Sequence, residues 1–98
     1  MKTAVKQEFT KHAHTERTDR ILDIAMTCGF GNVMYKRYQM ATDTMHELTD
    51  TGVIIIKGTT GAVVTMYKAT MAQALWVAQL SHLPNFLARR ILKNNKKK

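Results

Sequence analysis

The 98-residue sequence has little cysteine, few acidic residues and no long apolar run. Cys28 is the only cysteine, which excludes an intrachain disulfide and a cysteine-based zinc site and is typical of a reducing compartment. The longest aliphatic run, Val53 to Ile56, is too short to cross a bilayer. The opening residues, MKTAVKQEF, lack the apolar segment of a secretory signal. We therefore expect a cytoplasmic protein without a membrane span.

Several familiar site patterns are also missing. The glycines of CGFGN (28–32) and KGTTG (57–61) do not match a nucleotide-binding loop. The spacing supports no Ser-His-Asp order and no pair of catalytic carboxylates. His12 and His14 are two positions apart, which points them to different faces of a helix, and no other spacing resembles a metal site. We therefore expect neither a metal nor a cofactor.

Positive charge is what the chain has in excess. Fifteen Lys and Arg against seven Asp and Glu give a net charge of +8, which indicates a polyanionic partner such as nucleic acid, an acidic protein or an anionic membrane. The clearest basic group is C-terminal and comprises Arg89, Arg90, Lys93, Lys96, Lys97 and Lys98. We expect it to bind the phosphate backbone of RNA or DNA in a salt-dependent way, although such charges can also serve solubility alone. The length indicates one domain, residues 1–94, followed by a basic tail, 95–98.

A helix is expected near the N-terminus. Thr10 can cap it, and a core-facing stripe recurs at helical spacing through His14, Thr18, Ile21, Ala25 and Cys28. Gly29 or Gly31 should end it in the left-handed conformation of a C-terminal cap.

Four strands should follow, at residues 33–40, 44–49, 53–57 and 62–67. The third strand is apolar on both faces, so we expect it at the centre of the sheet. Because the connections are short, the pattern predicts an antiparallel meander.

Two C-terminal helices complete the prediction. Thr70 and Gln73 match a capping box before a helix over 71–80, and Pro84 begins a helix that ends near Asn94. The first of these, Met71 to Leu80, is apolar nearly all round, so it should be buried or should cover a protein partner or a second copy of the chain. The fold class is therefore α+β: an N-terminal helix, a four-stranded antiparallel meander sheet and two C-terminal helices.

The segment FTKHAHTERTDRILDI, Phe9 to Ile24, has the residue types of a metal-free ribonuclease site. His12 and His14 could exchange protons near neutral pH, and Arg17 and Arg20 could hold phosphate. Periodicity favours His14 and Arg17, because His14 extends the core-facing stripe. The alternative is that these side chains are solvated or serve packing.

Two strands carry further candidates. Tyr35, Arg37 and Gln39 share one face of the first strand, where tyrosine could stack on a base and arginine could hold phosphate, unless they serve packing. Thr65 and Tyr67 share one face of the fourth strand with Val63.

FTKHA, the arginines of the same helix and TGAVVTMYKAT together resemble small phage- and plasmid-borne proteins of the RelE/BrnT kind, whose fold type includes barnase and EndoU ribonucleases. The resemblance covers Phe9 to Thr70. It implies that His12 is the helix histidine, Arg17 or Arg20 the helix arginine, and Thr65 and Tyr67 the polar residues of the last strand. The sequence departs from the family pattern in one spacing: His12 and Arg17 are five positions apart, whereas four would place them on one face of the helix.

Three hypotheses remain open. The first is a metal-independent endoribonuclease of the toxin type, in a bacterial host cell. The second is a non-catalytic phage protein that counters a host defence of the CRISPR type by binding protein or nucleic acid. The third is a toxin–antitoxin or homo-oligomeric assembly formed through Met71 to Leu80.

Overall fold

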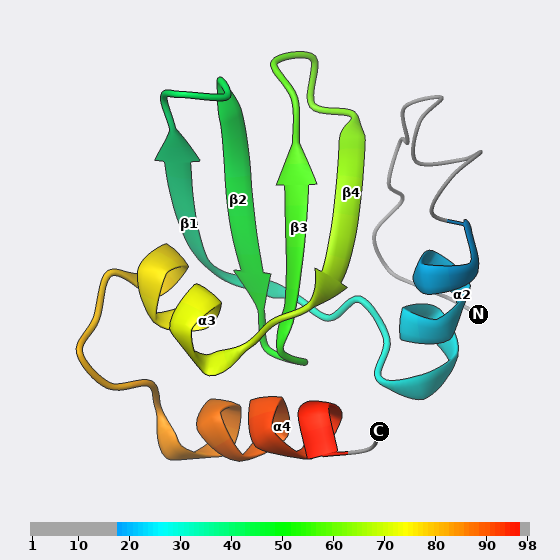
Figure 1. Ribbon diagram of the computed structural model, residues 1–98, viewed down its shortest axis with the longest axis vertical. Helices are drawn as coiled ribbons and strands as arrows, with labels where there is room; N and C mark the ends of the chain where they lie inside the picture. Colours follow the sequence, from blue (N-terminus) through cyan, green and yellow to red (C-terminus); the bar gives the residue numbers. More distant parts are fainter. Residues whose placement is uncertain (1–17, 97–98) are drawn as a thin grey trace.

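The computed structural model describes residues 18–96, which form a four-stranded sheet and three helices. The elements, in chain order, are α2 (Thr18–Thr27), β1 (Val33–Gln39), β2 (Thr44–Thr49), β3 (Val53–Lys57), β4 (Val63–Lys68), α3 (Met71–Ala78) and α4 (Asn85–Lys96) (Figure 1). This arrangement confirms the predicted α+β class. The predicted helix start and five candidate site residues lie outside the described residues: Thr10, His12, His14, Arg17, Lys97 and Lys98.

The sheet is the predicted meander. Its strand order is β1-β2-β3-β4, and each strand pairs with the next in antiparallel fashion. Gly52 has a φ of +82° between β2 and β3, and Gly61 has a φ of +89° between β3 and β4. Glycine adopts these angles without the steric cost that a Cβ would bring, which explains the tight connections.

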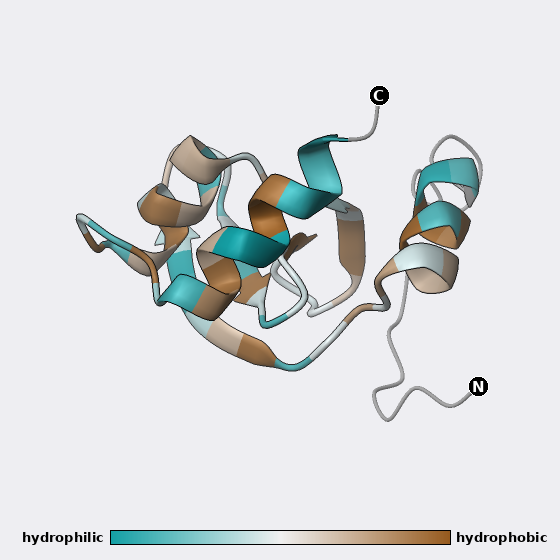
Figure 2. Ribbon diagram, turned by 90° about the horizontal axis from the view of Figure 1, so that it is seen from below, coloured by the Kyte–Doolittle hydropathy of each residue, from teal (hydrophilic) through white to brown (hydrophobic). Residues whose placement is uncertain are grey.

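β3 lies between two hydrophobic cores, as its apolar sequence predicts. Ile54 and Leu48 pack with α3 and α4 on one face, whereas Val53 and Ile55 pack with Ile24 of α2 on the other. Alternate residues of a strand point to opposite faces, so one short segment supplies both cores. Figure 2, seen from below, shows α4 in the foreground with α3 on one side and α2 on the other.

The predicted stripe of α2 is wrong in one position. Ala25 is exposed, whereas Ile24 is fully buried, with Ile21 and Cys28 half-buried beside it. Spacings of three and four residues place Ile21, Ile24 and Cys28 on one face, and the larger isoleucine takes the buried position. The helix ends as predicted at Gly29, which has a φ of +76° and donates its backbone N–H to Ile24 O at 2.7 Å.

A β-bulge in β4 shows that one prediction from residue alternation, the face of Val63, is wrong. The β3–β4 register shifts so that Ile56 is opposite Thr65 but Lys57 is opposite Val63. One extra residue therefore separates Val63 from Thr65 in the ladder. Val63 lies in the core beneath α2, on the other face of the sheet from Thr65 and Tyr67.

The C-terminal helices begin as the sequence indicates and end differently. The capping box is present: Gln73 N donates to Thr70 Oγ1 at 3.2 Å, and Thr70 N donates to Gln73 Oε1 at 3.0 Å. α3 ends at Ala78, two residues before the predicted Leu80, because Gln79 is left-handed with a φ of +57°. α4 continues past Asn94 to Lys96, so residues 95 and 96 belong to the helix rather than to a tail.

Replacing Ile55 by Ala should lower the free energy of unfolding by about 2–5 kcal/mol, because it empties a position that is only 1% exposed in the centre of the sheet. Leu92→Ala removes a side chain that is 60% exposed and should change stability by less than about 0.5 kcal/mol. Urea denaturation of both variants and the parent measures the difference. Equal midpoints for Ile55→Ala and the parent would contradict this core.

Candidate nucleic-acid interface

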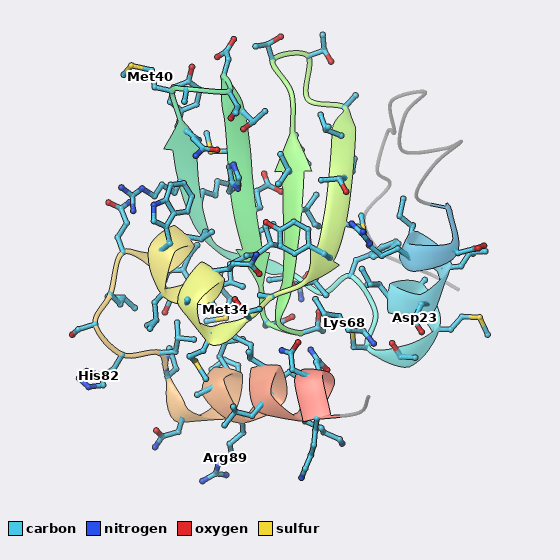
Figure 3. The ribbon with its side chains drawn as sticks, viewed as in Figure 1. Asp23, Met34, Met40, Lys68, His82 and Arg89 are labelled. Atoms are coloured by element: carbon cyan, nitrogen blue, oxygen red, sulfur yellow. The ribbon has the colours of Figure 1, made fainter. Side chains whose placement is uncertain are left out.

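The exposed side of α4 carries a row of cations, and the helix contains no acidic residue that could neutralise them. Arg89, Arg90, Lys93 and Lys96 are exposed, whereas Leu87 and Ile91 on the other side of the helix are buried. The helix sequence NFLARRILKNNK contains no acidic residue, and no ion pair within residues 18–96 involves these four side chains. Arg89 projects away from the sheet (Figure 3). The exposed side of α4 is therefore a patch of positive potential.

Lys68 extends this patch towards α2. Its Nζ lies 3.1 Å from the exposed carboxylate of Asp23, and the two side chains face each other in Figure 3. A hollow of about 420 Å³ is lined by Thr27, Lys68, Lys93, Asn94 and Lys96. We call Lys68, Arg89, Arg90, Lys93 and Lys96 the basic face.

The thiol of Cys28, at the end of α2, is subject to the charges of the basic face. Burial raises the pKa of the Cys28 thiol, and the charges of Lys68 and Arg90 act in the opposite direction. The charges of β4 and α4 therefore oppose the effect of burial on this thiol.

Hydrogen bonds fix α4 against the sheet. Asn94 Nδ2 donates to Thr51 O at 3.0 Å, and Asn95 Nδ2 donates to Ala69 O at 2.8 Å. The helix also passes close to Gly52, where an added Cβ would lie 3.1 Å from Ile91 Cγ1. A glycine at this turn therefore allows the close approach that holds the basic face in place.

A second polar region lies on the sheet face that α3 covers. The pairing aligns Arg37 with His46, His46 with Ile56, and Ile56 with Thr65, so these side chains cross one face of the sheet. Between this face and α3 is a pocket of about 140 Å³, which we call the sheet pocket; it is lined by Gln39, His46, Ile54, Tyr67, Gln73, Trp76 and Val77.

Arg37 and Tyr35, predicted to form an open binding platform, both contact the rest of the protein. Arg37 Nη1 donates to Trp76 O at 2.9 Å, and its guanidinium carbon lies 4.2 Å from the centre of the Trp76 ring. Tyr35 is half-buried and packs against the core that includes Leu48 and Ile54. In this arrangement Arg37 joins β1 to α3, and Tyr35 contributes to packing.

His46 lines the sheet pocket and is only 9% exposed. Its Nε2 lies 3.2 Å from both Gln39 Oε1 and Thr44 Oγ1, and its ring meets Trp76 edge-on at 5.2 Å between centroids. Burial lowers the pKa of His46 below its usual value of 6.5, because desolvation disfavours the charged imidazolium. The ring is therefore neutral at pH 7.

Two predicted site residues lie together on β4, and the charge of a third acts on one of them. Tyr67 and Thr65 share the face of the sheet pocket, and Thr65 Oγ1 is buried without a hydrogen-bond partner among residues 18–96. Burial raises the pKa of Tyr67, and the positive charge of Arg20 opposes that shift. The other predicted members of this site, His12, His14 and Arg17, lie outside the described residues.

Sequence reasoning missed His46, Trp76 and Lys68. Alternation along β2 gives the face of His46, but nothing local shows that α3 folds over that face and brings Trp76 to it. Lys68 follows a strand that was expected to end at Tyr67, so it was not grouped with cations more than twenty positions later.

The chain matches none of the family models, curated proteins or solved structures with which it was compared. Within residues 18–96, no group of three or more His, Cys, Asp or Glu side chains is arranged to hold a metal ion. None of the helices in that range has the length and apolar character needed to cross a membrane.

Stability should fall as the pH drops below about 6.5, because the unfolded chain binds a proton at His46 more readily than the folded chain does. The stabilisation is fully present above the usual histidine pKa and is lost as the pH falls through the lowered one. His46→Gln should therefore show a smaller decrease between pH 7.5 and pH 5 than the parent, measured by urea denaturation. His82→Gln, at an exposed position, is the matched control. Identical pH profiles for the parent and His46→Gln would refute this role of His46.

Proposed function

We propose that the protein binds nucleic acid through the basic face. The observation that carries this proposal is the row of exposed cations on α4 that have no acidic partner within residues 18–96. Lysine and arginine at such positions neutralise phosphates and release counterions, which gives affinity without sequence preference. The fixed position of α4 favours this function, because the charges are held on a rigid element before the ligand arrives.

An anionic lipid surface would attract the same charges, but the packing of α4 favours nucleic acid. A helix that lies in a membrane interface buries its apolar side in lipid. In α4 Leu87 and Ile91 are buried in the protein core, and the large apolar side chains left in solvent are Phe86 and Leu92, which offer little apolar surface to lipid. Binding to phosphate groups through the exposed cations leaves this packing intact.

Binding of a single-stranded oligonucleotide should weaken linearly on a log–log plot of affinity against salt concentration. Lys93→Gln removes one cation from the middle of the basic face, so it should lower the magnitude of that slope by about 0.7, the contribution of one contact to a single-stranded phosphate. Fluorescence anisotropy at several salt concentrations measures both slopes.

Lys36→Gln provides the matched control. Lys36 is a β1 side chain that is 60% exposed and lies on the opposite face of the sheet from α3, 4.0 Å from Glu47. The Lys36→Gln substitution removes the same charge at a site away from the basic face, so it should leave the salt slope unchanged. Equal slopes for the Lys93 and Lys36 variants would show that only net charge matters, and a parent that does not bind at low salt would remove nucleic acid as the partner.

Cleavage of bound RNA is a second candidate function. It is favoured by Tyr67 and Thr65, which share one face of β4, and by the charge of Arg20, which acts on the pKa of Tyr67. The RelE/BrnT resemblance selects the same three residues. A neutral tyrosine can donate a proton to a leaving oxygen, and arginine can stabilise the charge that develops on phosphate.

If the protein cleaves RNA in the presence of EDTA, Tyr67→Phe should reduce the rate about a hundredfold or more, because the ring is kept and the transferable proton is lost. A single-turnover assay with a labelled RNA measures this rate. Thr59→Ala, in an exposed turn, is a control that should cleave normally. Undiminished cleavage by Tyr67→Phe would contradict the assignment, and binding without cleavage would favour the non-catalytic, defence-countering hypothesis.

A further inference from the structure

The sheet pocket has the size of a single ring. Its volume is about 140 Å³, and an apolar cavity of about 150 Å³ is known to hold benzene. Ile54 and Val77 form part of its walls, and Trp76 provides an aromatic side that is 37% exposed. The pocket can therefore take one six-membered ring and leave the substituents of that ring in solvent.

Trp76 is held in position before any ligand enters. The Arg37 guanidinium lies 4.2 Å from the ring centre and donates to the backbone carbonyl of the same residue, while the His46 ring meets Trp76 edge-on. An aromatic side chain restrained on two sides loses little further freedom when it contacts a ligand.

The polar groups in the pocket are those that recognise an uncharged ring with carbonyl oxygens. The side-chain oxygens of Gln39 and Gln73 accept hydrogen bonds from Thr42 Oγ1 and Thr70 N. No hydrogen bond within residues 18–96 uses the side-chain amide N–H of either glutamine, so both keep donors for a ligand. His46 and Tyr67 are neutral at pH 7, because burial lowers the pKa of the first and raises that of the second.

Positive charge is found at the edge of the pocket rather than inside it. Arg37 lies beside Trp76, with its guanidinium carbon 4.2 Å from the ring centre. A neutral interior with a cation beside it fits a ligand whose planar ring carries a phosphate at some distance, which describes a nucleotide.

We propose that the sheet pocket binds one pyrimidine base of a single-stranded nucleic acid. The amide donors of Gln39 and Gln73 face the ring carbonyls, and Trp76 contacts the ring. The single-ring volume favours pyrimidines over purines. The inference that the natural ligand is a nucleic-acid strand rests on the proposed function. The preference of the pocket for a pyrimidine base is independent of that function.

Trp76 gives a direct readout, because it is the only tryptophan of the chain. Titration with uridine or cytidine 5′-monophosphate should quench its fluorescence in a saturable way. Adenosine and guanosine monophosphates should bind at least about tenfold more weakly, and ribose 5-phosphate, which lacks a base, should leave the emission unchanged. Equal quenching by ribose 5-phosphate would assign the effect to phosphate alone, and no quenching by any nucleotide would overturn the proposal.

Gln73→Glu tests the polar contacts. Glutamate preserves the capping box but removes the amide N–H groups, so the helix should form while pyrimidine binding weakens at least about tenfold. Ala72→Glu adds the same charge at an exposed position of α3 and should bind like the parent. Circular dichroism checks that both variants fold. Unchanged binding by Gln73→Glu would contradict the assignment of that side chain and of the pocket.

Two combined outcomes separate this proposal from the proposed function. Salt-dependent binding of an oligonucleotide, without quenching by pyrimidine monophosphates, would eliminate the pocket and retain the basic face. Quenching by these nucleotides, without any binding of the oligonucleotide at low salt, would retain the pocket and eliminate the basic face.

Discussion

The burial of β3 on both faces is the constraint on which the rest of the structure depends. Ile54 and Ile55 point in opposite directions, and each needs a cover that the sheet alone cannot supply. α2 covers one face of the sheet, and α3 and α4 cover the other. The basic face and the sheet pocket follow from this arrangement: burial of Leu87 and Ile91 turns the cations of α4 outward, and burial of Ala74 and Val77 brings Trp76 to β1.

The two candidate sites use different physics: the basic face lies on α4 and at the end of β4, and the sheet pocket lies between α3 and the sheet. The basic face is a surface of fixed charges with hollows between them, suited to a flexible polyanion whose affinity depends on salt. The sheet pocket is small, neutral and partly aromatic, suited to one planar group held by hydrogen bonds. Backbone charge would supply affinity and the pocket would supply preference, which is the usual division in the recognition of single strands.

Local sequence patterns predicted the fold well, because each element carries its own signal. The two-sided apolar run identified β3, the Thr70–Gln73 pair identified the start of α3, and Gly29 identified the end of α2. The errors arose where tertiary packing decides: Ile24 rather than Ala25 entered the core, and a bulge moved Val63 to the opposite face from Tyr67. The basic face was largely readable from composition. The sheet pocket was not, since it requires His46 and Trp76, thirty positions apart, to meet through the docking of α3.

The proposed binding of nucleic acid by α4 can be tested by mapping backbone amide chemical shifts on isotope-labelled protein. Addition of a short single-stranded oligonucleotide should shift the amides of Arg89, Arg90, Lys93 and Lys96, together with that of Lys68, and should leave the Lys36 amide of β1 in place. Higher salt should reverse these shifts, because the interaction is electrostatic. Shifts confined to regions away from α4, or no shifts at low salt, would contradict the account.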